Sequence, residues 1–218
     1  MKNLIIACDN LREEIEYIKN CTNSKAEVIY VDSKYHNNPA NLNNEILKII
    51  KMKEKSYDNI LLTYGQCGNA IINLKSDYSN IIFPKVSDCI SLYLGGDEKR
   101  SQIKDSERTY FFTKTYLENT NSLYNEIRIL KNKYGEKEAI DMYRMVMQNY
   151  KYIRIIDTKA YNIEEIMDKV DELCYDLDLK KEVINADLSI LRKAIIWDID
   201  NQFVKKEKKS KILSEDFV

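Results

Sequence analysis

The fold is decided by residues 1–18, MKNLIIACDNLREEIEYI, where a short apolar run is followed by a helical pattern. The run from Met1 to Ala7 is rich in branched apolar side chains and predicts a buried strand. From Leu11 to Ile18, apolar residues recur at helical spacing and predict an amphipathic helix. A strand followed directly by a helix is the repeating unit of α/β proteins.

The same order of strand and helix continues along the chain. Further strands are predicted at residues 27–31, 59–63, 80–86, 109–113, 152–156 and 182–184. Helices are predicted at residues 41–53, near 69, and at 122–149 with a break near Gly135, 163–177 and 188–196, and residues 90–94 are an apolar stretch at which a helix could begin. Apolar strands that alternate with helices are typical of a parallel sheet covered on both faces. We therefore expect a Rossmann-like α/β fold with a mainly parallel sheet and a helical lobe in the second half.

Few residues in the chain could form a flexible linker, since it contains only two prolines and five glycines. Boundaries between domains usually fall in linkers rich in such residues. We therefore expect a single α/β domain over residues 1–218, with residues 1–100 and 101–204 as lobes of one continuous sheet. The lysine-rich residues 205–218 are expected to form a charged, solvated tail.

Composition limits the classes of partner. Of the 218 residues, 44% are hydrophobic and 32% are charged, which is typical of a globular protein rather than a disordered or membrane protein. Lysine and arginine number 34 against 35 acidic residues, so no strong field attracts nucleic acid or anionic lipid. No apolar run reaches the roughly 18 residues of a spanning helix, and Asn3, Cys8 and Asp9 interrupt the start of the chain. We expect a cytoplasmic protein with no membrane or nucleic-acid partner.

The five cysteines are odd in number and irregular in spacing. In a reducing compartment such cysteines are expected to be free thiols. Cys21 and Cys174 lie on or just after predicted helices, and we assign both to packing.

The other three cysteines and the only histidine follow predicted strands. Cys8 follows the first strand, His36 the second, Cys67 the third and Cys89 the fourth. In an open α/β sheet, ligands bind beyond the carboxyl ends of the strands, where these loops converge. Thiolate and imidazole are ligands of zinc and of iron–sulfur clusters, so we predict that these four residues bind one or the other.

Each of these residues also has a structural interpretation. Cys8 at a strand end could be a small buried hydrophobe, and His36 in a polar loop could be exposed or could cap a helix. Cys67 lies between Gly65 and Gly68, which allow close backbone approach. Cys89 precedes an apolar run, and a helix that begins there would lower the pKa of its thiol.

Neighbouring residues are expected to contact the bound cofactor, namely Tyr64, Gly65, Gly68, Asn69 and Asp88. Asp88 could be a fourth ligand of the metal or could support a ligand. The turn lacks a Walker lysine and a GxGxxG spacing, and the chain has no GxSxG motif. Two other functions stay open, an enzyme with Cys67 or Cys89 as its nucleophile and an accessory protein that binds a small ligand.

Four short segments form a distinctive pattern, namely residues 64–69 (YGQCGN), Pro84, residues 88–90 (DCI) and residues 94–95 (LG). This pattern resembles the DUF1638 family of bacterial and archaeal proteins. Weaker matches extend over most of the chain, at residues 6–8, 36, 39, 133–135, 149–150, 156–158, 187–188 and 191. One departure is Thr115-Tyr116, which stands where the family has a Gly-Trp pair, so an aromatic contact to the ligand could differ here.

The resemblance implies a cytosolic protein without a settled activity. It also implies a link to anaerobes and to corrinoid-dependent methyl transfer. A corrinoid protein or a methyltransferase is therefore an expected partner, beside a small molecule or a metal. A bound zinc would serve such chemistry by stabilising the thiolate of a substrate.

Overall fold

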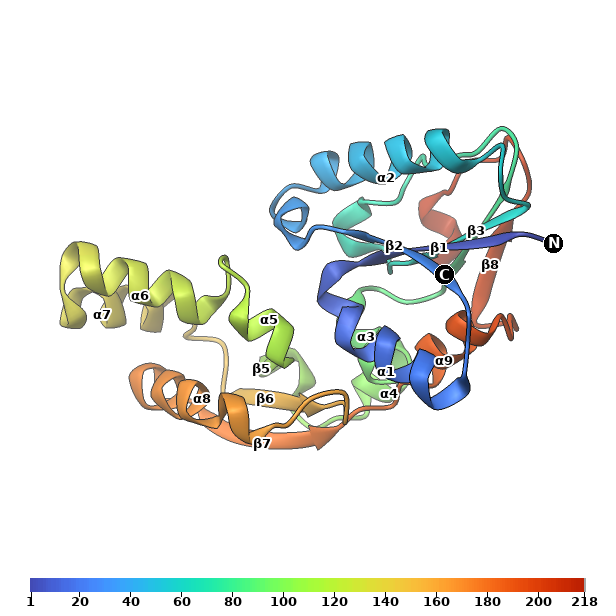
Figure 1. Cartoon of the computed structure of the whole chain (residues 1–218). Helices are drawn as coiled ribbons and strands as arrows, with labels where there is room; N and C mark the ends of the chain where they lie inside the picture. The colour runs from blue at the N-terminus through green and yellow to red at the C-terminus, as the bar shows by residue number, and fades with distance from the viewer. Residues whose placement is uncertain (218) are drawn as a thin grey trace. The chain divides into compact units, whose positions relative to one another are not determined.

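The structure is a computed structural model that describes residues 1–217 (Figure 1). It contains two compact units, each with its own sheet. The first unit is formed by Met1–Arg100 together with the residues from Asp187 onward, and the second by Ser101–Ala186. The α/β class and the Rossmann-like arrangement are confirmed, but two sheets replace the expected continuous one.

The first sheet has the strand order β2-β1-β3-β4-β8. Its strands are β1 (Asn3–Cys8), β2 (Glu27–Val31), β3 (Asn59–Thr63), β4 (Asn80–Pro84) and β8 (Phe203–Lys206). Strands β1 to β4 are parallel, and β8 runs antiparallel to β4. The central strands β1 and β3 are almost entirely buried, as their continuous apolar sequences require. The carboxyl ends of β1 to β4 therefore share one edge of the sheet.

Helices cover both faces of this sheet. Figure 1 shows α2 (Pro39–Lys53) on one face, with α1 (Arg12–Thr22) and α9 (Ser189–Ile196) on the other. Helix α2 begins where the Asn38 side chain accepts hydrogen bonds from the amides of Ala40 and Asn41. It buries the apolar stripe of Leu42, Ile46, Ile49 and Ile50 against the sheet.

The end of the chain belongs to the first unit rather than to a solvated tail. Lys205 and Lys206 lie in β8, and Ile212 is fully buried. Lys206 Nζ pairs with Asp216 at 2.9 Å, and the ring of Phe217 lies 5.1 Å from that of Phe83. The apolar side chains of Ile212 and Phe217, which follow the lysines, dock this segment on the first unit. Because β8 pairs with β4, no other strand can extend the sheet beside β4.

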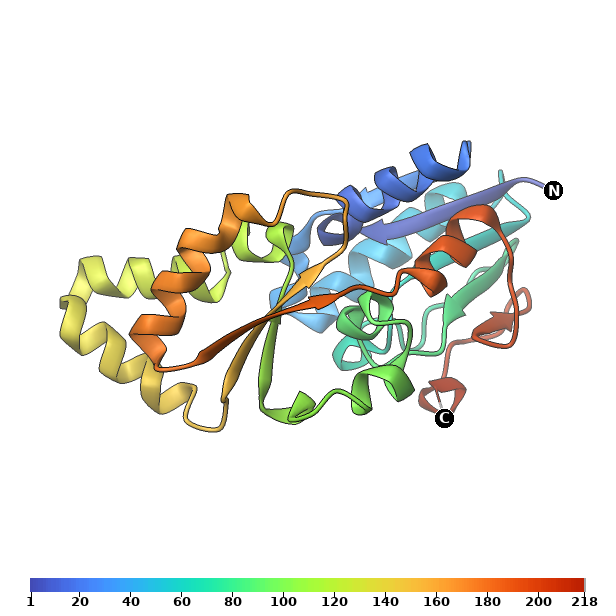
Figure 2. The same ribbon diagram turned by 90° about the horizontal axis from the view of Figure 1, so that it is seen from below.

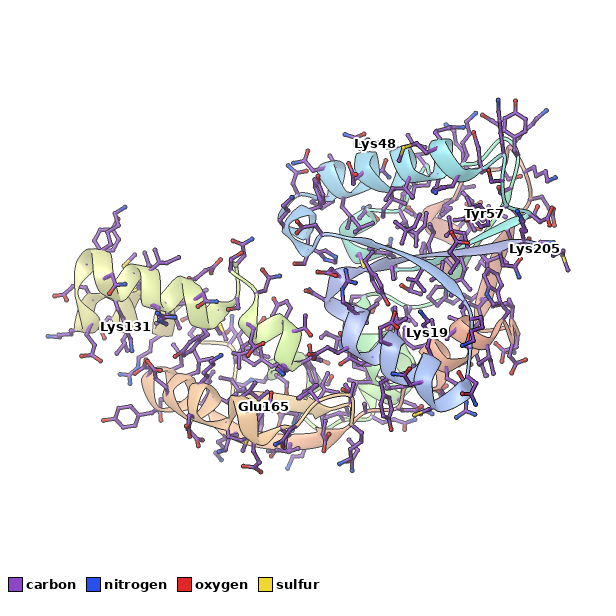
Figure 3. All side chains as sticks on the ribbon, viewed as in Figure 1. Lys19, Lys48, Tyr57, Lys131, Glu165 and Lys205 are labelled. Carbon is purple, nitrogen blue, oxygen red and sulfur yellow. The ribbon has the colours of Figure 1, made fainter. Side chains whose placement is uncertain are left out.

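The second unit is a smaller parallel sheet with the order β5-β6-β7 (Figure 2). Its elements are β5 (Thr109–Phe112), α5 (Lys114–Glu118), α6 (Leu123–Tyr134), α7 (Glu136–Val146), β6 (Tyr152–Asp157), α8 (Glu164–Leu177) and β7 (Lys180–Asn185). Gly135, with φ +94°, separates α6 from α7, so the predicted break is confirmed. Lys131 on α6 pairs with Asp176 and Glu172 on α8, at 2.6 and 3.3 Å (Figure 3).

Tyr116, at the departure from the family pattern, belongs to the core of the second unit. Its hydroxyl lies 3.1 Å from that of Tyr110, and its ring packs on Phe112. None of the helices within residues 1–217 has the length and apolar character needed to cross a membrane.

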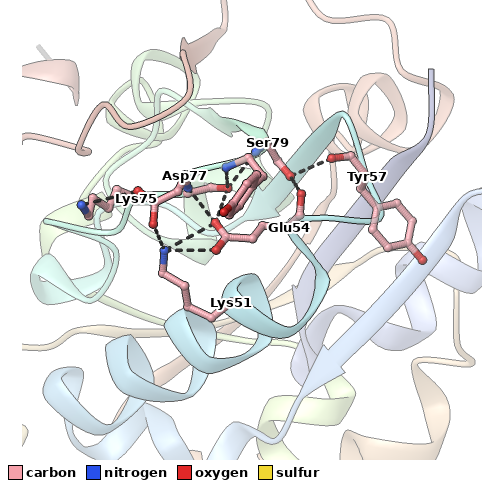
Figure 4. A network of polar contacts seen from close by, with 8 residues as sticks. Lys51, Glu54, Tyr57, Lys75, Asp77 and Ser79 are labelled. Atoms are coloured by element: carbon pink, nitrogen blue, oxygen red, sulfur yellow. Dashed lines mark hydrogen bonds and ion pairs between the residues drawn. The ribbon is translucent and has the colours of Figure 1, made fainter.

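The amino edge of the first sheet contains a buried polar network (Figure 4). Glu54, at the end of α2, accepts hydrogen bonds from the Ser76 hydroxyl at 2.7 Å and from the Asp77 amide at 2.6 Å. Lys51 Nζ lies 3.2 Å from the same carboxylate. The Ser79 hydroxyl donates to the carbonyl groups of Glu54 and Tyr57. This network ties α2 to the segment that leads into β4.

Candidate functional site

All four predicted ligands lie at the carboxyl edge of the first sheet. Cys8 is the last residue of β1, and His36 lies in the 3₁₀ turn Ser33–Asn37 after β2. Cys67 follows β3, and Cys89 opens α3 (Cys89–Tyr93) after β4. Parallel strands thus deliver three thiols and an imidazole to one region of the first unit.

Cys8 and His36 are in direct contact. Cys8 is buried, and its Sγ lies 2.9 Å from Nε2 of His36. The same sulfur accepts a hydrogen bond from the Asn10 amide at 3.4 Å. Burial lowers the pKa of His36, so its imidazole is neutral at pH 7. Burial, followed by the charge of Cys89, raises the pKa of Cys8 far above its ordinary value.

Cys67 is held by pairing between the loops that follow β3 and β4. The amides of Gln66 and Cys67 donate to the carbonyl groups of Val86 and Ser87, each at 3.0 Å. Gly65 makes this close approach possible, because a Cβ there would lie 2.7 Å from the Val86 carbonyl oxygen. The pairing continues the parallel order of the strands and brings Cys67 beside the start of α3.

The turn at Cys67 has an unusual backbone. Cys67, Gly68 and Asn69 all have positive φ, at +46°, +63° and +72°. Gly68 and Asn69 are exposed, and the Asn69 side chain accepts a hydrogen bond from Gln66 Nε2 at 2.9 Å. Gly68 and Asn69, which we expected to contact a cofactor, thus shape the outer rim of the site.

Asp88 and Cys89 begin α3. Asp88 caps the helix by accepting a hydrogen bond from the Ser91 amide at 3.1 Å. Its carboxylate also pairs with Arg100, at 2.7 and 2.8 Å. The sequence prediction missed Arg100, because it lies in a charged segment with no motif. Since Asp88 has this partner, we assign it to holding the start of α3 rather than to a metal.

The three thiols act on one another electrostatically. Burial is the main cause that raises the pKa of Cys67, to about 12, and the charges of Asp88 and Cys8 add to it. Hydrogen bonds from the amides of Gly65 and Cys89 partly oppose this rise. Burial and the charge of Cys67 likewise raise the pKa of Cys89. The expectation that a helix amino terminus would lower the pKa of Cys89 is therefore wrong, since burial outweighs the helix dipole.

Two buried hydroxyl groups at the end of β3 have no hydrogen-bond partner among residues 1–217. They are Thr63 Oγ1 and the Tyr64 hydroxyl. The ring of Tyr64 stacks on His36, with 6.3 Å between centroids. Buried polar groups are nearly always paired, so unpaired ones at a sheet edge mark a place where a ligand could bind.

The remaining cysteines lie outside the site. Cys21 is exposed on α1, so its predicted role in packing is wrong. Cys174 packs against the core of the second unit, as predicted. Within residues 1–217, no three Cys, His, Asp or Glu side chains are arranged around a position for one metal ion.

The fold and this edge define a Rossmann-like α/β protein with a thiol-rich region beyond its parallel strands. Residues 30–195 match the model of the family described as "Protein of unknown function (DUF1638)". The chain therefore belongs to the DUF1638 family. No curated protein and no solved structure matches it.

Proposed function

We propose that this protein binds an iron–sulfur cluster through the thiolates of Cys8, Cys67 and Cys89. The observation that carries the proposal is that three parallel strands of the first sheet lead into these cysteines at one edge, with Cys8 buried and Cys67 and Cys89 half-buried. Three thiolates in one region of the protein repel one another, and the positive charge of bound iron would offset that repulsion. Sulfur donors are also the ligands that such clusters prefer.

A cluster suits this arrangement better than a single zinc ion. Structural zinc needs four ligands around one point, and residues 1–217 contain no set of three so placed. A cluster distributes its thiolate ligands over several iron atoms, so their sulfurs need not converge on one ion. His36, neutral and 2.9 Å from Cys8 Sγ, would orient that ligand.

The pKa directions argue against a cysteine nucleophile. A nucleophilic cysteine needs a lowered pKa, whereas burial raises the pKa of all three thiols. A metal displaces the proton from a thiol when it binds, so a raised pKa does not prevent ligation. It makes the affinity for metal depend on pH, with tighter binding as the pH rises.

Anaerobic purification tests the proposal. Wild-type protein, reconstituted with ferrous iron and sulfide, should contain both elements in stable amounts and absorb visible light. Cys67→Ser should lose most of the iron and sulfide, whereas Cys21→Ser, at an exposed thiol, should keep them. Because Cys21 lies outside the site, it controls for non-specific binding by thiols.

Two results would contradict the cluster. One zinc per chain without sulfide would replace it with a mononuclear site. If wild type stays metal-free after reconstitution and its three thiols react freely, the result would favour a protein that binds a small ligand instead.

A further inference from the structure

The Tyr64 side chain places a buried hydroxyl group at the candidate site. It is 1% exposed, and its hydroxyl has no partner within residues 1–217. Tyr93 at the same edge provides a contrast, since its hydroxyl donates to the Asn10 carbonyl at 2.8 Å. A buried hydroxyl that loses its hydrogen bonds to water and gains none destabilises the folded protein.

The surroundings of Tyr64 point toward the thiols. Its ring stacks on His36, which itself contacts Cys8. Its phenol carries a proton at physiological pH, as tyrosine ordinarily does. Tyr64 is thus a buried donor with no acceptor within residues 1–217, and its ring stacks on the histidine that contacts Cys8.

We infer that Tyr64 donates a hydrogen bond to a negatively charged acceptor on the bound cluster. This inference rests on the proposed function. The acceptor is either a cluster sulfur or a small anion bound to an iron atom. In both cases Tyr64 is a positioning residue that stabilises the loaded site and contributes nothing to the metal-free one.

The test compares Tyr64→Phe with Tyr93→Phe and wild type. In metal-free protein, Tyr64→Phe should unfold at the same temperature as wild type or higher, because no hydrogen bond is lost. Tyr93→Phe should unfold at a lower temperature, because it loses the bond to Asn10. In reconstituted protein, Tyr64→Phe should bind iron about tenfold more weakly than wild type.

Two further measurements identify the acceptor. If it is a cluster sulfur, the reduction potential of Tyr64→Phe falls below that of wild type without any added anion. If it is a bound anion, the potential stays unchanged and cyanide binds about tenfold more weakly to Tyr64→Phe.

The inference is overturned if Tyr64→Phe matches wild type in iron affinity, potential and cyanide binding while both contain the cluster. Iron-free wild type after reconstitution would instead overturn the proposed function, and this inference with it. The two failures are therefore distinguished by the iron content of wild type.

Discussion

The two edges of the first sheet differ in how most of their buried polar groups are paired, although Asn80 Oδ1 at the amino edge also lacks a partner among residues 1–217. At the amino edge, the Glu54 carboxylate has partners in Ser76, Asp77 and Lys51 (Figure 4). At the carboxyl edge, the hydroxyls of Thr63 and Tyr64 have none among residues 1–217. A buried polar network in which every group is paired stabilises the fold by itself. Buried polar groups without partners destabilise the fold unless a bound ligand supplies the missing hydrogen bonds. The comparison separates the structural edge from the edge that we assign to binding.

The largest effect is expected at the structural edge. Glu54→Ala should lower the free energy of unfolding by about 3 kcal/mol, because it leaves the Ser76 hydroxyl and the Asp77 amide without their acceptor. Urea denaturation measures the loss. Glu207→Ala, at an exposed ion pair with Lys205, should cost less than about 1 kcal/mol.

The iron content of the same variant should be measured as well. Glu54→Ala should bind as much iron as wild type under conditions in which it is folded. A loss of iron that matches Cys67→Ser would remove the distinction between the two edges.

The second largest effect is expected in the rate at which the thiols are alkylated, compared between the native and the unfolded protein. In metal-free native protein near pH 8, iodoacetamide should modify Cys67 on the order of a hundredfold more slowly than in the urea-unfolded chain. The scarcity of thiolate at a pKa of about 12 outweighs the higher nucleophilicity of a more basic sulfur. Mass spectrometry of peptides measures both rates. Rapid native alkylation of Cys67 or Cys89 alone would favour the nucleophile hypothesis.

A smaller effect is expected where the loops of the carboxyl edge meet. Gly65→Ala should cost about 2 kcal/mol and reduce iron binding, because its Cβ would lie 2.7 Å from the Asp88 amide nitrogen. Gly68→Ala should cost about 1 kcal/mol, since its φ is +63° but its nearest neighbour, Pro39, is 3.6 Å away. Denaturation and iron analysis of both variants test this order, and equal iron contents would contradict it.

The smallest effect concerns acid stability. Burial by itself would raise the pKa of Glu54, but hydrogen bonds from Ser76, Asp77 and Lys51 together lower it below its usual value of 4.5. A lowered pKa contributes stability above pH 4.5 that is lost as the pH falls through the folded-state value. Between pH 6 and pH 3, wild type should therefore lose more stability than Glu54→Gln. Parallel losses in the two proteins would show that Glu54 does not titrate as described.

Much of the fold could be predicted because the strands are locally distinctive. Glu27–Val31 and Asn59–Thr63 were predicted with the bounds that the structure shows. Strand β8 was missed because Phe203–Lys206 is short and half lysine, and its pairing with β4 joins residues far apart in the chain. That pairing closes one edge of the first sheet, and the strands between residues 101 and 186 form a separate sheet instead of the predicted continuous one.

The candidate site was predictable in its position and not in its electrostatics. Cys8, Cys67 and Cys89 each follow a parallel strand, and such strands end at one edge whatever their details. The partnership of Asp88 with Arg100 could not be predicted, since it depends on how the chain turns after α3.

The sequence alone predicted the alternation of strand and helix, the parallel sheet and the edge at which the thiols lie. It could do so because periodicity and chain direction are local properties. Only the folded chain showed the division into two units, the raised pKa values of the thiols and a Tyr64 hydroxyl with no partner among residues 1–217. Burial and pairing depend on what the rest of the protein places around a residue, and no local pattern contains that information.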